Sequence, residues 1–267
     1  MLGWFKNKQI ARIEIIGPID RNMRDRTLES LEKVEKQKFP ALVVRIDSPG
    51  GTVVDSHEIY EALRRLQSKM KVVASFGNIS ASGGVYVAMG AQYIMANPGS
   101  ITGSIGVILR GNNLERLLDK VGVSFKVVKS GPYKDILAFD RPATPEEIAI
   151  LQQLIDSSFQ QFVRVVAEAR KMTEEAVRAF ADGRVFTGQQ GLELGLVDRL
   201  GSEEDARLWA AELAGLDPKT AKFYTIKPPK PLLNRFLPGS AEVWQRLRFE
   251  LETSGMPLWL WRGWGSC

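Results

Sequence analysis

The stretch that decides the fold is ALVVRIDSPGGT, at residues 41–52. Its first six residues are almost continuously apolar, which is typical of a strand buried on both faces of a parallel sheet. Two glycines then make a turn, an amphipathic helix follows with Ile59, Leu63 and Leu66 on one face, and residues 71–76 form a second apolar strand. This order of strand, glycine turn, helix and strand predicts a βαβ unit and therefore an α/β fold.

The flanking sequence extends the same pattern in both directions. Residues 10–16 are expected to form a strand, and residues 20–38 a charged helix that Pro40 closes. Downstream we predict a helix at 83–90, a strand at 93–96, and a long helix from 144 to about 171 that begins with the capping box Thr-Pro-Glu-Glu. We expect one domain over residues 1–215. The remainder, residues 216–267, is expected to contain a proline-rich linker at 227–231, a short helix at 241–251 and a tryptophan-rich tail.

Composition excludes several classes of protein. With 44% hydrophobic and 25% charged residues, a chain of 267 residues can bury a large core, so we expect a globular protein. The net charge of +5 is small and the basic residues form no long block, which predicts no nucleic-acid partner. One cysteine, Cys267, and one histidine, His57, exclude an internal disulfide and a zinc site of several Cys and His ligands. We expect no metal and no cofactor.

The sequence does not predict a membrane-spanning segment. Charge interrupts residues 1–8 before an apolar run of signal-peptide length develops. No later apolar run approaches the roughly 20 residues of a spanning helix. We therefore expect a cytoplasmic or peripheral membrane location.

A candidate catalytic centre begins at residues 78–84, NISASGG, where small residues surround Ser82. A serine hydroxyl becomes a nucleophile only when a base accepts its proton. His57 lies among polar residues at the start of a predicted helix, so we expect an ordinary surface or helix-terminal histidine. A lysine can serve as the base instead, and Lys134 lies in a largely apolar segment, GPYKDILAF at residues 131–139.

A lysine works as a base only when it is neutral. Lowering the pKa of its ammonium from about 10.4 to about 7 requires burial away from carboxylates or a neighbouring positive charge. The apolar neighbours of Lys134 offer burial, and in an extended segment the carboxylate of Asp135 would face the opposite side. Backbone N–H groups for the oxyanion are expected at the glycine turns Gly50-Gly51 and Gly83.

These segments, in this order, resemble the signal peptide peptidase A group of serine–lysine peptidases, the S49 type. The resemblance covers about residues 10–205. It is carried by DSPGG at 47–51, SASGG at 80–84, NPGSITGSIGV at 97–107, KSGPYKD at 129–135, DGRVFTG at 182–188 and GLVD at 195–198. It implies the fold shared by Clp protease subunits and crotonases, built from repeated ββα units, with a C-terminal helical extension.

The resemblance also implies a role for each candidate residue. Ser82 would be the nucleophile, Lys134 its general base and Ser104 the hydroxyl that orients the lysine, while Gly51 and Gly83 would donate to the oxyanion. A rival nucleophile, Ser80, lacks the glycines that directly follow Ser82. The implied activity is that of a serine endopeptidase acting on cleaved signal peptides and other unfolded or membrane-associated peptides. Serine and lysine are expected on one chain, in a homo-oligomer whose neighbouring subunits help to complete the substrate groove.

Three alternatives use the same fold. A Clp-type serine–histidine protease needs a histidine downstream of the serine, and residues 104–110 contain none. A crotonase-like acyl-CoA enzyme needs no nucleophilic serine, so Ser82 and Lys134 together argue against it. A reactive Ser82 would likewise exclude a non-catalytic membrane-scaffold protein.

The role of the tail beyond residue 228 stays open at this point. Indole rings favour the headgroup region of a membrane, so peripheral membrane contact is one alternative. Packing against the domain or a neighbouring subunit is a second, and disorder is a third. The residues concerned are Trp244, Arg246, Arg248, Trp259, Trp261, Arg262 and Trp264.

Overall fold

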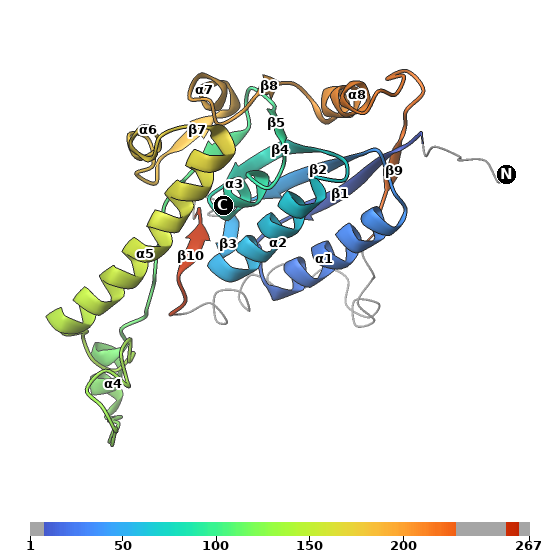
Figure 1. The fold of residues 1–267 in the computed structure, drawn as a ribbon. Coiled ribbons are helices and arrows are strands. Elements are labelled where there is room, and N and C mark those ends of the chain that lie inside the picture. The colour runs from blue at the N-terminus through green and yellow to red at the C-terminus, as the bar shows by residue number, and fades with distance from the viewer. Residues whose placement is uncertain (1–7, 228–254, 262–267) are drawn as a thin grey trace.

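A mostly parallel β-sheet forms the centre of the protein in the computed structural model, which describes residues 8–227 and 255–261 (Figure 1). Within these residues the sheet has eight strands, in the order β7-β6-β4-β2-β1-β9, with β5 beside β4 and β8 beside β5. Only the β6–β7 pair is antiparallel. The strands are β1 (Ile10–Ile16), β2 (Ala41–Ser48), β4 (Lys71–Ala81), β5 (Tyr93–Ala96), β6 (Ile101–Gly103), β7 (Val185–Thr187), β8 (Arg199–Leu200) and β9 (Phe223–Thr225).

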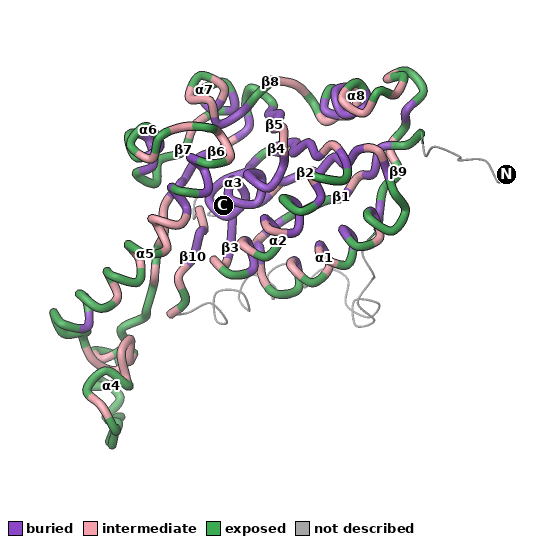
Figure 2. The backbone as a smooth tube through the Cα atoms, viewed as in Figure 1, coloured by how far each residue is buried: buried purple, intermediate pink, exposed green. Residues whose placement is uncertain are grey.

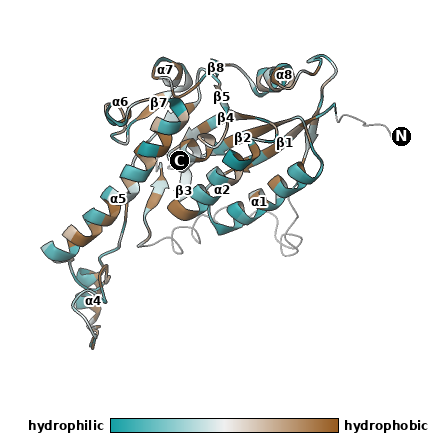
Figure 3. Cartoon of the chain, in the orientation of Figure 1, coloured by the Kyte–Doolittle hydropathy of each residue, from teal (hydrophilic) through white to brown (hydrophobic). Residues whose placement is uncertain are grey.

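Helices cover both faces of this sheet, which confirms the predicted α/β fold. On one face α1 (Arg21–Lys36), α2 (Val53–Leu66) and α3 (Gly83–Ala88) enclose the larger core, and Figure 3 shows both apolar and polar stretches on α1 and α2. On the other face α8 (Glu203–Leu213) packs on β1, β2 and β4. Residues of β2 alternate between the two cores, because successive side chains of a strand point to opposite faces.

Strand β4 is longer than the sequence predicts and extends to the candidate nucleophile. Its first part pairs with β5, and its last part, Ile79 to Ala81, pairs with β6. The pairing between β2 and β4 shifts register after Ile46, and Ser48 lies opposite Ser80. The predicted Gly50-Gly51 turn is likewise a short strand, β3 (Gly50–Thr52). Most of the predicted linker and the predicted helix at 241–251 lie outside the described residues.

An arm, residues 108–144, projects from the body together with the first turns of α5 (Pro145–Arg170) (Figure 1). It carries α4 (Glu115–Val121), and Figure 2 shows that most of it is exposed. The predicted capping box starts α5, with Glu147 N donating to Thr144 Oγ1 at 3.2 Å and Thr144 N donating to Glu147 Oε2 at 2.9 Å. The C-terminal half of α5 packs on the body through Phe162, Val163 and Val166.

The remaining helices are short: α6 (Glu174–Arg178) and α7 (Gly188–Glu193) lie near the end of α5 and strand β7. Among the helices of residues 8–227 and 255–261, none combines the length and apolar character needed to cross a bilayer.

Candidate active site

Ser82 occupies a strained turn between a strand and a helix. Strand β4 ends at Ala81, α3 begins at Gly83, and Ser82 has φ 53° and ψ −116°, outside the regions that a non-glycine residue ordinarily adopts. Two backbone hydrogen bonds hold it: Ser82 N donates to Gly103 O at 2.8 Å and Tyr86 N donates to Ser82 O at 3.0 Å. Strain that the surrounding structure holds in place is typical of functional sites. A sharp strand-to-helix turn of this kind presents the nucleophile in many hydrolases.

Ser104 lies beside Ser82, as the resemblance implies. Ala81 of β4 is paired with Gly103 of β6, so the two serines follow directly on neighbouring parallel strands. Like Ser82, Ser104 has a positive φ, 52°, and its backbone N donates to Arg184 O at 2.7 Å. The structure therefore brings these two candidate residues together.

The backbone amides of Gly51 and Gly83 face one small space. A methyl group built on Gly83 would lie 3.0 Å from Gly51 N, and one built on Gly50 would lie 2.6 Å from Gly83 N. Ser56 borders the same space, because its Oγ would be 2.7 Å from the methyl group on Gly83. The two predicted oxyanion donors are thus neighbours, and side chains at Gly50 and Gly83 would fill the space between them.

A segment near the C-terminus lies along this space. Strand β10 (Leu258–Leu260) pairs antiparallel with β3, with Trp259 opposite Gly51. On its other edge, Ile108 N donates to Leu258 O at 3.0 Å and Leu258 N donates to Ile108 O at 2.8 Å. β10 therefore occupies a groove between β3 and Ile108 as its middle strand, and Figure 1 shows it beside β3.

The side chain of Trp259 is fully buried in an aromatic pocket. Its rings stack on Tyr86 at a centroid distance of 3.9 Å and lie 5.0 Å from Phe162. At the polar end of the pocket, the Tyr86 hydroxyl is 2.9 Å from His57 Nδ1 and accepts from Gln161 Nε2 at 3.1 Å. Burial raises the pKa of the Tyr86 phenol.

One sequence expectation changes accordingly, and one open alternative is decided for part of the tail. His57, expected as an ordinary surface or helix-terminal histidine, is half-buried within α2 and bonded to Tyr86. Packing of the tail against the domain is confirmed for Trp259, whereas Trp244 and Trp264 lie outside the described residues.

Lys134 is not brought to Ser82 within one chain. It is exposed on the arm, in a turn where its backbone N donates to Gly131 O at 3.3 Å, so the side-chain alternation of an extended segment does not apply there. The same loop lies near the segment that leads into β10, because Leu137 Cδ1 is 3.5 Å from a methyl group built on Gly255. Lys134 is thus exposed on the arm while Ser82 is buried in the body.

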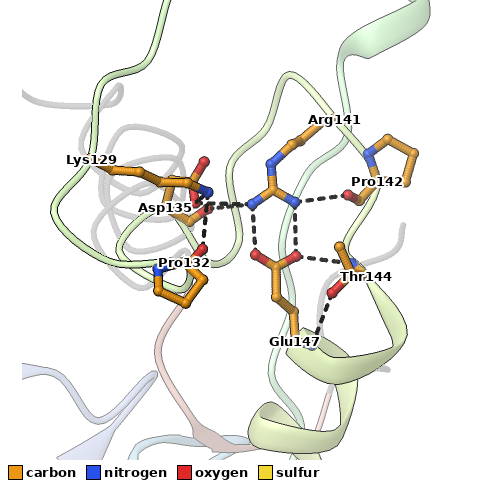
Figure 4. Close-up of polar contacts among 7 residues, drawn as sticks. All are labelled: Lys129, Pro132, Asp135, Arg141, Pro142, Thr144 and Glu147. Carbon is orange, nitrogen blue, oxygen red and sulfur yellow. Dashed lines mark hydrogen bonds and ion pairs between the residues drawn. The ribbon is translucent and has the colours of Figure 1, made fainter.

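Charged residues at the start of α5 hold this loop (Figure 4). Arg141 makes two hydrogen bonds to the buried carboxylate of Glu147, at 2.6 and 2.8 Å, and lies 3.1 Å from Asp135. Lys129 Nζ lies 2.6 Å from Asp135 Oδ1. Arg141 lowers the pKa of Glu147 to about 2, and Lys129 lowers the pKa of Asp135. The Asp135 carboxylate is thus engaged by two cations other than Lys134.

The chain matches the model of Peptidase family S49 over residues 64–217, and the Clp protease model over residues 6–100. The first match spans more than half of the chain. The chain belongs to peptidase family S49. It is accordingly a serine peptidase, and the alternatives of an acyl-CoA enzyme and a non-catalytic scaffold are not supported.

Two relatives of this S49 peptidase carry protease or peptidase names. It is 63% identical over 267 residues to a Synechocystis protein named "Putative protease slr0021", with 96% of each chain covered. It is 35% identical over 213 residues to an Enterococcus faecium protein named "Putative signal peptide peptidase SppA", covering 75% of this chain and 62% of that protein.

The Clp-type fold is confirmed by a solved structure of ClpP1 from Listeria monocytogenes. The TM-score is 0.52 at 18% identity, with 73% of this chain and 93% of that chain covered. At this identity the likeness shows the fold alone.

The sequence of this S49 peptidase did not predict the groups that line the groove: Ser56, Tyr86, Phe162 and the placement of Trp259. The sequence could have placed Tyr86 near Ser82, because it lies one helical turn after Ser82 on a predicted helix. No such signal existed for Trp259, since pairing between residues 51 and 259 leaves no local pattern. Among the described residues, no group of three or more His, Cys, Asp or Glu side chains is placed to hold a metal ion.

Proposed function

We propose that this S49 peptidase is an endopeptidase that uses Ser82 as nucleophile and Lys134 as general base. The observation that carries the proposal is the convergence of four groups at one point of the fold. Strained, buried Ser82 follows β4, Ser104 lies on the next strand, and the amides of Gly51 and Gly83 face the space beside them.

In the proposed reaction, Ser82 Oγ attacks the carbonyl carbon of the peptide bond while the neutral amine of Lys134 takes its proton. The N–H groups of Gly51 and Gly83 stabilise the oxyanion, and one such donor contributes about 3 to 4 kcal/mol. The lysine then protonates the leaving amine, and water hydrolyses the ester on Ser82. Ser104 orients the lysine.

A second copy of the chain delivers the base in this proposal. Lys134 is exposed on the arm of its own chain, whereas Ser82 is buried. The arm and the first turns of α5 also expose many apolar side chains, a feature of surfaces that an assembly covers. Packing of this surface against a neighbour would shield Lys134 and bring it to that neighbour's Ser82, within a homo-oligomer. The exposed apolar residues include Leu117, Val121, Phe125, Val128, Ile148 and Leu154.

Unfolded peptides are the proposed substrates, with cleaved signal peptides and other membrane-associated peptides among them. The groove between β3 and Ile108 accepts a strand through backbone hydrogen bonds, as β10 demonstrates. Only an extended chain can make such bonds on both edges. An unfolded peptide can adopt this extended form.

The test compares Ser82→Ala with Ser80→Ala. Ser80 is also buried, it is the rival nucleophile, and its hydroxyl has no hydrogen-bond partner within the described residues, so removing it leaves no group unpaired. We expect Ser82→Ala to abolish turnover of a fluorogenic peptide with an unchanged melting temperature, and Ser80→Ala to remain active. A fully active, folded Ser82→Ala protein would refute the assignment.

A further inference from the structure

We infer that the groove beside Ser82 selects a large aromatic side chain directly before the cut bond, and that the chain's own Trp259 occupies this position as an internal competing ligand. The inference rests on the proposed function for the identity of the cut bond. It concerns which peptides bind, and its test needs no turnover.

The backbone of β10 lies as a peptide about to be cut would lie. Trp259 is opposite Gly51 in the antiparallel pair. A methyl group built on Gly83 would lie 3.0 Å from the carbonyl oxygen of Trp259 and 3.0 Å from Gly51 N. A methyl group built on Gly50 would clash with the same oxygen and would lie 2.6 Å from Gly83 N. The oxygen therefore lies where the two amides converge, which is the place of a carbonyl under attack.

Binding continues on both sides of this carbonyl. Before it, Leu258 exchanges two backbone hydrogen bonds with Ile108, at 2.8 and 3.0 Å. After it, Trp261 N donates to Pro49 O at 2.7 Å. The segment thus spans the position of Ser82 in the manner of a substrate strand, with Trp259–Leu260 in the place of the bond to be cut.

The pocket around Trp259 is shaped for a flat ring. Tyr86, on the helix that Ser82 begins, stacks on the indole with an interplanar angle of 24°, and Phe162 of α5 closes a second side. Offset stacking of aromatic rings contributes beyond the burial of area. A small or charged side chain would forfeit these contacts, so aromatic residues are the preferred occupants.

The indole itself is an imperfect occupant. Trp259 Nε1 is buried and has no hydrogen-bond partner within residues 8–227 and 255–261. An unpaired buried donor weakens binding by about five-fold or more, and a phenylalanine has no such donor. The tail therefore competes for the groove because it is tethered, while a peptide with phenylalanine at this position displaces it.

The test measures binding of a labelled peptide with the sequence of residues 255–261, GMPLWLW, to the full-length chain carrying Ser82→Ala. Using this background keeps the result separate from the assignment of the nucleophile and base. In the chain that also carries Trp259→Ala, we expect the peptide to bind at least about ten-fold more tightly, because its competitor is removed. Met256→Ala is the matched control, since Met256 is 46% exposed and precedes the paired strand.

Further measurements test the aromatic pocket and control for misfolding of the variants. Replacing the peptide's fifth residue, the tryptophan that corresponds to Trp259, should give the affinity order phenylalanine, tryptophan, alanine, from tightest to weakest. In the conservative Trp259→Phe chain the tail should hold the groove more firmly and the peptide should bind more weakly than to the parent. If both Trp259 variants bound the peptide with the affinity of the parent chain, the inference that Trp259 is an internal ligand would be overturned. Equal binding of the alanine and tryptophan peptides would overturn the aromatic pocket.

Discussion

Ser82 and Lys134, the two residues of the proposed dyad, lie in opposite kinds of surroundings. Ser82 is 1% exposed, in a turn that the central sheet and α3 fix through backbone hydrogen bonds. Lys134 is exposed on an arm that ion pairs of Arg141 join to the start of α5. The body thus holds Ser82 in a fixed geometry, while the arm leaves Lys134 exposed. In the proposed mechanism this difference means that one chain holds the nucleophile and the oxyanion donors ready, and that assembly with a second copy supplies the base.

The largest expected effect on peptide turnover comes from replacing Lys134 on the arm. Lys134→Ala and Lys134→Arg should both abolish peptide turnover with an unchanged melting temperature, because guanidinium stays protonated and cannot accept a proton. Lys126→Ala, at another exposed lysine of the arm, should remain active. Turnover by the arginine variant would show that the base lies elsewhere.

Co-expression of inactive Ser82→Ala and Lys134→Ala chains then asks which chain supplies the base. If Lys134 serves the Ser82 of a neighbour, random mixing restores up to about a quarter of the sites. No recovered turnover in verified mixed oligomers would place both residues of a working site on one chain.

A smaller effect is expected from Ser104→Ala, which alters the region between the two halves. Losing the orienting hydroxyl should lower kcat/KM by about 10- to 100-fold, by analogy with other groups that position a catalytic residue. In the wild type kcat/KM should rise with pH, because the amine must lose its proton to act. A pH profile of both proteins checks these claims. An optimum below about pH 6, or an unaltered profile in Ser104→Ala, would contradict the mechanism.

The smallest effect is expected where the arm joins α5. Glu147→Gln removes the charge that Arg141 binds, so kcat/KM should fall about five-fold while Ser82 stays intact. Amide hydrogen exchange in residues 129–141 should accelerate. Glu146→Gln, at the exposed neighbouring position, is the control.

Acid should act on the same contact in the wild type. The pKa of Glu147 is lowered from 4.5 to about 2 in the folded protein, so its stabilising contribution is complete above pH 4.5 and is lost as the pH falls toward 2. Exchange at residues 129–141, corrected for its intrinsic pH dependence, should therefore accelerate across this window in the wild type. If exchange in Glu147→Gln accelerated equally over this pH range, protonation of Glu147 would not be the cause of the faster exchange.

Local patterns in the sequence determined much of the body. Apolar runs and capping residues predicted β1, β2, β5, α1 and α5, because strand and helix periodicities and caps depend on neighbours along the chain. The small-residue motif around Ser82 likewise predicted a turn before a helix, and the structure places Gly51, Gly83 and Ser104 around it.

Only the tertiary structure decided what fills and what completes the site. Pairing of Gly51 with Trp259, stacking of Trp259 on Tyr86, and the separation of Lys134 from Ser82 join or divide residues far apart in the sequence. Such contacts depend on how the whole chain packs. A strand can pair with any exposed strand edge of suitable shape, and its own sequence does not specify which edge that is. For the same reason the sequence identified Lys134 as a residue type suited to be the base, but the structure had to show that one chain leaves it exposed on the arm.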